Sequence, residues 1–250
     1  MIQARTRLRR VLAAAILCFP AGCGAQGPDV IPLKSEPHHH LVLHNDFVNV
    51  YSVQVQPHDS VLLHKHEFDA IGIMLSDAEI TVSAPGKPDS HQKVVGGQLR
   101  LQQAGYIHST IIDGNSAYRN VTVELLMPQQ EHRNICASVI SAQPLNCPAA
   151  QPDRPAISQQ PQFETNQTKL NLTRLKPRQS FTLDASPQNR LVVVLDEAAV
   201  VSSANNPSKA LHSGDILWRD SNSPAQIFEN AGSKEIRLVT FAFTNDNFAK

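Results

Sequence analysis

The sequence carries one pattern twice, with the second copy 117 to 120 residues after the first. A repeat of this length predicts two domains of the same fold in tandem, because each copy is long enough to bury its own core. In three places the copies match closely: Pro57-x-x-Ser60-x-x-Leu63 with Pro177-x-x-Ser180-x-x-Leu183, Gly97–Leu101 with Gly214–Trp218, and Arg119–Val123 with Arg237–Phe241.

Within each copy, short apolar or alternating runs are separated by turn signals. The chain has 17 prolines, and no long segment has the apolar period of a helix. Pro85-Gly86-Lys87-Pro88 and Asp113-Gly114-Asn115 are typical turn sequences. Many short strands joined by such turns predict an antiparallel sandwich or barrel. The strands expected in the first copy are 47–55, 61–63 leading into a histidine pair, 71–75, 79–83, 99–101, 106–112 and 119–126.

Two histidines stand two residues apart directly after the first copy of the first of these motifs, in His64-Lys65-His66. Residues i and i+2 of a strand point to the same face, so both imidazoles can reach one metal ion. A third candidate ligand is His108, which follows Gly97 and Gly105. Such a set holds Fe, Mn, Ni, Cu, Co or Zn as a divalent ion, and the ligand types alone do not choose between them.

The stretches Pro57–Gly72 and Gly97–His108 resemble the two signature motifs of the cupin superfamily. These motifs are Gly-x5-His-x-His-x3-4-Glu-x6-Gly and Gly-x5-Pro-x-Gly-x2-His-x3-Asn. With the duplication, the chain resembles a bicupin over nearly its whole mature length. The resemblance implies an all-β fold of two tandem cupin barrels, also called jelly rolls or double-stranded β-helices. It also implies that His64, His66 and His108 hold the metal inside the first barrel. The domains expected are a signal peptide over 1–25, an N-terminal cupin over 38–128, a Pro/Gln-rich linker over 129–162 and a degenerate C-terminal cupin over 163–247.

The sequence departs from the family at the fourth ligand. The glutamate of the first motif falls on Ala70 or Ile71. Asp69 lies one residue short and reaches the metal only if the chain bends after His66; otherwise it is a surface or turn carboxylate. Glu67 points away from the histidine pair if the strand continues. Gln103 replaces the proline of the second motif, either as loop support or as a hydrogen-bonding contact to a ligand.

Several other residues have two interpretations each. Tyr106 shares a face with His108 and is either a catalytic proton donor or a packed tyrosine. Glu124 faces solvent or the barrel interior. Trp218 fills a core or a domain interface. His38-His39-His40 enters the first strand at the surface, although one of the three can line the barrel mouth.

The second copy keeps the scaffold residues but loses the three histidines. Aligned on the repeat, their positions are Asp184, Ser186 and Ala225. One carboxylate without an imidazole is a poor site for a divalent transition metal. We therefore expect the second barrel to be metal-free and structural.

The N-terminus has the layout of a secretory signal peptide. Four arginines precede the apolar run Val11–Phe19, and small residues follow up to Ala25. This run is too short to span a bilayer. An alternative is lipidation at Cys23, since Ala21-Gly22-Cys23 resembles the end of a lipobox, although Pro20 stands where that motif prefers leucine.

Removal of the four arginines leaves four more acidic than basic residues, which argues against nucleic acid as a partner. Export also predicts a Cys136–Cys147 disulfide, worth roughly 3 kcal/mol by loop entropy, within a linker whose prolines and glutamines disfavour regular structure. The function expected is that of an exported metal-dependent oxygenase, isomerase or lyase acting on a small organic molecule. The alternative is a non-enzymatic cupin that binds a small ligand or has a structural role.

Overall fold

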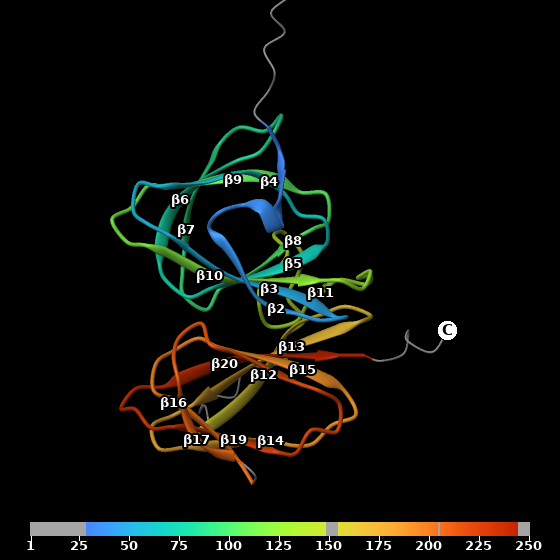
Figure 1. Ribbon diagram of the computed structural model, residues 1–250, viewed down its shortest axis with the longest axis vertical. Helices are drawn as coiled ribbons and strands as arrows, with labels where there is room; N and C mark the ends of the chain where they lie inside the picture. Colours follow the sequence, from blue (N-terminus) through green and yellow to red (C-terminus); the bar gives the residue numbers. More distant parts are fainter. Residues whose placement is uncertain (1–28, 149–154, 205, 245–250) are drawn as a thin grey trace, which may run out of the picture.

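The computed structural model describes residues 29–148, 155–204 and 206–244. The signal peptide and Cys23 expected from the sequence lie outside the described residues. Two barrels stack along the long axis of the molecule, the first drawn in blue to green and the second in yellow to red (Figure 1). The described chain is built of strands and one short 3-10 turn, η1 (Leu33–Ser35), which confirms the all-β class.

Each barrel consists of two sheets. Sheet A is β1 (Ile31–Pro32), β4 (Ser60–Lys65), β9 (Ile107–Ile112), β6 (Ala78–Ser83) and β7 (Ser90–Val94), in that order. Sheet B is β2 (His39–His44), β3 (Val48–Val55), β10 (Tyr118–Leu125), β5 (Asp69–Met74) and β8 (Leu99–Gln102). Sheet C is β11 (Arg133–Asn134), β12 (Ile157–Glu164), β13 (Thr168–Leu175), β20 (Ile236–Phe243), β15 (Asn189–Val194) and β18 (Ile216–Arg219). Sheet D is β14 (Ser180–Leu183), β19 (Gln226–Asn230), β16 (Ala199–Ser203) and β17 (Asn206–Leu211).

The duplication seen in the sequence is also a duplication of topology. The order β2-β3-β10-β5-β8 of sheet B returns as β12-β13-β20-β15-β18 in sheet C, and β4-β9-β6-β7 returns as β14-β19-β16-β17. Sheets B and C face each other in the middle of the molecule (Figure 1). The pairing of β1 with β4 is parallel, while the other ladders of the described strands are antiparallel.

The largest apolar cluster lies between the barrels rather than inside either of them. On β10, Val121, Val123 and Leu125 pack into this cluster with Leu191 and Phe241 of the second barrel. The alternate residues of β10, among them Thr122 and Glu124, therefore point into the first barrel. Of the two interpretations of Glu124, the structure selects the barrel interior, where it is 3% exposed.

Trp218 packs against this same cluster. Its ring lies 5.7 Å from that of Phe47 and 5.5 Å from that of Phe243, centroid to centroid. Of the two interpretations of Trp218, the structure selects the domain interface.

Two arginines fasten the interface symmetrically. Arg119 of β10 donates from Nη2 to the carbonyl of Ser213 in the second barrel at 2.9 Å. Its counterpart in β20, Arg237, donates from Nη1 to the carbonyl of Gly96 in the first barrel, also at 2.9 Å. Gly97 has a φ of +92°, and a Cβ there would collide with the Arg237 guanidinium, so glycine is required at this turn.

The predicted linker, and the segment between the expected signal peptide and the first expected barrel, contain regular structure. Residues 31–35 form β1 and η1, and Leu33 is buried in the interior cluster of the first barrel. The end of the linker is the strand β12, so the expectation of irregular structure is wrong there. Pro161 is tolerated because a bulge follows it and because β11 covers only Phe163 and Glu164 of that edge.

Candidate metal centre

Three histidines converge inside the first barrel. His64 lies in β4 directly opposite His108 in β9, and His66 follows the end of β4. The backbone of His66 continues the pairing, since its N–H donates to the Tyr106 carbonyl at 2.9 Å and its carbonyl accepts from Gly105 at 2.8 Å. Each imidazole offers one nitrogen, and these nitrogens all lie within 4.8 Å of one another. Nε2 of His66 and Nε2 of His108 are 3.1 Å apart.

The nitrogens of this cluster fit a metal ion. Nδ1 of His64 lies 2.8 Å from the Leu62 carbonyl, which fixes the proton there and leaves Nε2 as a lone pair. That Nε2 is buried with no partner, and so is Nδ1 of His66. Buried polar atoms without partners are costly, and a divalent ion satisfies such lone pairs.

The histidines are held neutral, which is the form that binds metal. Burial lowers the pKa of His64 to about 4, with a further contribution from His39. Burial lowers the pKa of His66 to about 3, with His64 and His39 acting in the same direction. Burial also places the pKa of His108 well below its ordinary value.

A buried carboxylate–imidazole pair supports the cluster from the N-terminal segment. The Glu36 side chain is fully buried and accepts from Nδ1 of His39 at 2.6 Å, from the His38 N–H at 2.8 Å and from the Leu62 N–H at 3.2 Å. Burial alone would raise the pKa of Glu36, but the hydrogen bonds from His39 and His38 lower it to about 2. The His39 ring lies 5.0 Å from the His64 ring, so His39 is the one of the three consecutive histidines that lines the interior.

The fourth-ligand candidates from the sequence lie elsewhere. Asp69 accepts from Nε2 of His132 at 2.7 Å and from the Ala104 N–H at 2.8 Å, so both its oxygens fasten loops. Glu67 is exposed. Gln103 is exposed and its carbonyl accepts from the Tyr106 N–H at 3.0 Å, a loop-supporting contact, although its side chain also borders the cleft described next.

An inner cavity and an outer cleft meet at the histidines. The inner cavity, about 30 Å³, is bordered by His39 and the three-histidine cluster. The outer cleft, about 630 Å³, opens between the edge strands β7 and β8. Both volumes share a wall that includes Gln102, His108 and Tyr118. A molecule in the cleft therefore has access to one side of the cluster.

Tyr106 lines this cleft together with His108, whose face the sequence pattern predicts it to share. Its ring stacks on His108 with centroids 4.8 Å apart and an interplanar angle of 20°. Burial raises the pKa of Tyr106, against the opposing effect of the Arg100 guanidinium. The tyrosine therefore carries its proton at neutral pH, with its ring beside a ligand histidine.

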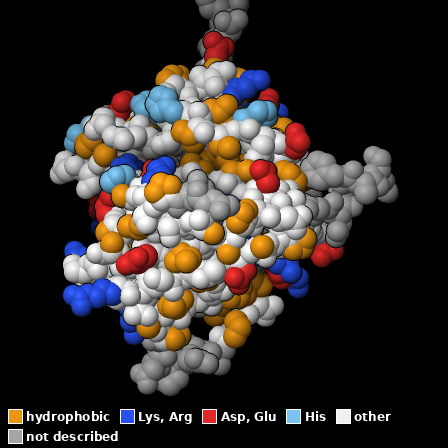
Figure 2. All heavy atoms as spheres, turned by 60° about the horizontal axis from the view of Figure 1, so that its bottom comes forward, with side chains coloured by type: hydrophobic (Ala, Val, Ile, Leu, Met, Phe, Trp, Pro, Cys, Tyr) orange, Lys and Arg blue, Asp and Glu red, His pale blue; other side chains and the backbone are white. Residues whose placement is uncertain are grey.

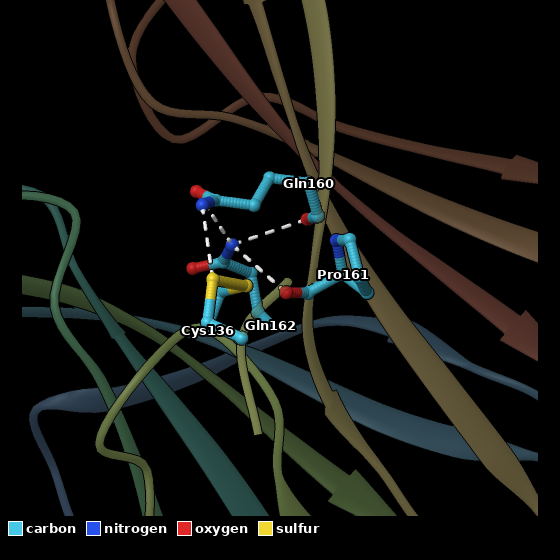
Figure 3. Close-up of a disulfide and its surroundings, with 5 residues drawn as sticks. Cys136, Gln160, Pro161 and Gln162 are labelled. Atoms are coloured by element: carbon cyan, nitrogen blue, oxygen red, sulfur yellow. Dashed lines mark hydrogen bonds between the residues drawn. A yellow bond between two sulfur atoms is a disulfide. The ribbon is translucent and has the colours of Figure 1, made fainter. Parts of the chain in front are cut away.

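A disulfide shapes one wall of the cleft. Cys136 and Cys147 are bonded, and the loop between them brings Ser138–Ser141 to the cleft. The Val139 carbonyl accepts from the Leu101 N–H at 3.1 Å, which fastens the loop to β8. Figure 3 shows Gln160 and Gln162 beside the disulfide, with Nε2 of Gln160 donating to Sγ of Cys147 at 3.6 Å.

In the second barrel a guanidinium occupies the corresponding region. Arg219 aligns with Gln102 in the repeat and is 5% exposed. It donates to the carbonyls of Leu183 at 3.0 Å, Asp184 at 3.5 Å and Ser223 at 3.2 Å. The group formed by His64, His66 and His108 is the one cluster of metal-binding side chains found among the described residues, and it lies in the first barrel.

Comparison with known proteins identifies the fold. Neither a scan against protein-family models nor a search of curated proteins gives a match. Among solved structures, AerE from Microcystis aeruginosa superposes with a TM-score of 0.58 at 12% identity, covering 87% of this chain and 98% of that one. Salicylate 1,2-dioxygenase from Pseudoaminobacter salicylatoxidans, crystallised with gentisate, gives 0.55 at 10% identity, covering 81% and 70%. A cupin 2 conserved barrel domain protein from Leptotrichia buccalis gives 0.50 at 11% identity, covering 82% and 87%.

These likenesses extend over both barrels, so the cupin fold expected from the motifs is confirmed in tandem. No helix among the described residues is long and apolar enough to cross a bilayer. On the face drawn in Figure 2, lysine and arginine side chains lie in small separate groups among acidic ones.

Proposed function

We propose that this chain, a bicupin in fold, is an exported metal-dependent enzyme that acts on a small organic molecule in its N-terminal barrel. The observation that carries the proposal is the set of three converging neutral imidazoles beside an open cleft, two of them buried and each with an unpartnered nitrogen. In this proposal His64, His66 and His108 hold one divalent Fe, Mn, Ni, Cu, Co or Zn ion. The second barrel contributes packing and no chemistry.

The residues around the cluster have distinct roles in this proposal. A bound metal of this kind supplies an open coordination position for dioxygen, a carbonyl oxygen or water. Glu36 orients His39, whose ring lies against His64. Tyr106 keeps its hydroxyl proton and stands where it can donate to a substrate beside His108. β5 and β10 contribute Met74, Asn120 and Thr122 to the lining of the inner cavity.

Oxygenase chemistry is the first to test, ahead of isomerase or lyase chemistry. One of the structures with this fold is a dioxygenase crystallised with gentisate, which is a reason to begin with oxygen uptake on aromatic acids. The non-enzymatic alternative keeps the cleft but needs no metal, and it predicts ligand binding or a structural role without turnover.

The decisive measurement is metal content after purification without a metal-binding tag. We expect about one transition metal ion per wild-type chain, and loss of most of it in His64→Ala and in His108→Ala, because two imidazoles cannot fill the coordination sphere. His132→Ala is the matched control, since His132 pairs with Asp69 outside the cluster. Equal, substoichiometric metal in all four proteins would reject the site and favour the non-enzymatic alternative.

A further inference from the structure

The outer cleft is lined by cations and neutral groups, with no carboxylate among its described lining residues. The cations are Lys87 and Arg100, and the chain as a whole has equal numbers of basic and acidic residues. Lys87 stands over the Tyr106 ring, with Nζ 6.0 Å from the centroid. A cleft with this lining favours an anion.

Arg100 is the deeper of the two cations, and the partners that the structure gives it are neutral. Its Nη1 donates to Oε1 of Gln92, and its Nη2 donates to Oε1 of Gln98 at 3.4 Å. Burial lowers the pKa of Arg100, yet a guanidinium remains charged at neutral pH. No described carboxylate forms an ion pair with it. A half-buried guanidinium held by two amide oxygens retains donors for an incoming anion.

The position of Arg100 links this charge to the histidine cluster. Arg100 lies on β8 two residues before Gln102, so both side chains point toward the barrel interior. Arg100, Tyr106 and His108 line one continuous cleft of about 630 Å³, a volume that accommodates an aromatic or short aliphatic acid. One molecule can therefore contact Arg100 with one end and approach the metal side of His108 with the other.

We propose that Arg100 forms the anion subsite of this cleft and that the substrate is a small carboxylate, bound by the guanidinium fork with its reactive part toward His108. A carboxylate matches a single planar fork in charge and shape. The inference rests on the proposed function for the word substrate, but the subsite can be tested without turnover.

The test is calorimetric binding to the full mature chain, with acetate, benzoate and phenylacetate each compared with its neutral amide. We expect at least one acid to bind roughly tenfold or more tightly than its amide. Arg100→Gln should remove that preference, Arg100→Lys should restore part of it, and metal content should stay at the wild-type level in both. Arg190→Gln, which removes a guanidinium from the second barrel, is the matched control and should bind like wild type.

Absence of acid preference in every pair, or an unchanged preference in Arg100→Gln, would overturn the subsite. Competition by inorganic phosphate at the strength of the best acid would overturn the carboxylate assignment. The two proposals fail separately. Arg100-dependent binding of an acid by a protein that contains no metal would reject the metal enzyme alone. Stoichiometric metal, with equal affinity for each acid and its amide, would reject the subsite alone.

Discussion

Single residues decide whether the metal cluster is held in place, and Glu36 is the one the sequence did not reveal. Its carboxylate contacts four backbone or imidazole donors, although it precedes the first barrel expected from the sequence. The signal available was a glutamate two and three residues before a pair of histidines, a pattern that occurs in many loops. The role of Glu36 becomes visible only in the fold, where this N-terminal segment packs on the first barrel with Leu33 in its core.

Glu36 should make stability depend on pH. Its pKa is about 2 in the folded chain, against about 4.3 when unfolded, so its contribution is complete above pH ~4.3 and is lost as the pH falls toward 2. We expect Glu36→Gln to lower the free energy of unfolding at pH 7 by up to roughly 3 kcal/mol. Urea unfolding of both proteins should show this gap closing in acid.

A surface carboxylate provides the control for that measurement. Glu79 pairs with Lys93 but both are exposed and screened by water, so Glu79→Gln should cost much less than Glu36→Gln. A gap between wild type and Glu36→Gln that stays constant from neutral pH to acid would contradict the role assigned to the carboxylate.

At the scale of strands and loops, the sequence predicted the parts with strong local signals. The His64–His66 spacing, the turn at Asp113–Asn115 and the duplicated glycine motif were sufficient to predict the barrels and to bring the three histidines together. The inward face of β10 was not predictable, because its apolar residues cover the other barrel while its polar residues line the interior. Alternation along a strand identifies two faces but not which of them a second domain will bury.

Removal of the disulfide should lower the stability of the fold without changing metal binding. We expect the double variant Cys136→Ala/Cys147→Ala to lose about 3 kcal/mol of unfolding free energy. Its metal content should equal that of wild type, because the ligands lie on β4 and β9 or beside them. Urea unfolding measures the loss of stability, and elemental analysis measures the metal content.

Peptide mapping without reduction should recover Cys136 linked to Cys147 in exported protein. Two freely alkylated cysteines would contradict the pairing.

At the scale of the whole molecule, the two barrels share a topology but differ in their interiors. Imidazoles gather in the first, whereas in the second Arg219 binds backbone carbonyls near Leu183 and Ser223. A buried guanidinium repels a metal cation and already satisfies the carbonyls around it. The missing ligands and the presence of this arginine are the two reasons why we expect the second barrel to bind no metal.

The expected difference between the two barrels leads to a prediction for Asp184, the one carboxylate at an aligned ligand position. Asp184→Ala should leave the metal content per chain unchanged, because the proposed metal cluster belongs to the first barrel. Elemental analysis beside His64→Ala, which should lose metal, makes the comparison. A proportional fall in metal on changing Asp184 would show that the second barrel holds an ion and that the repeat is misaligned.

The reciprocal contacts of Arg119 and Arg237 bear on how such a chain arose. Each arginine reaches the turn next to a glycine in the other half, so the contact has the form of an isologous interface between two identical subunits. A one-barrel ancestor could assemble through it as a homodimer, and fusion of two gene copies would make that assembly independent of concentration. After fusion the two barrels no longer had to be identical. The interior residues of one barrel could then change, provided that its interface with the other barrel was kept.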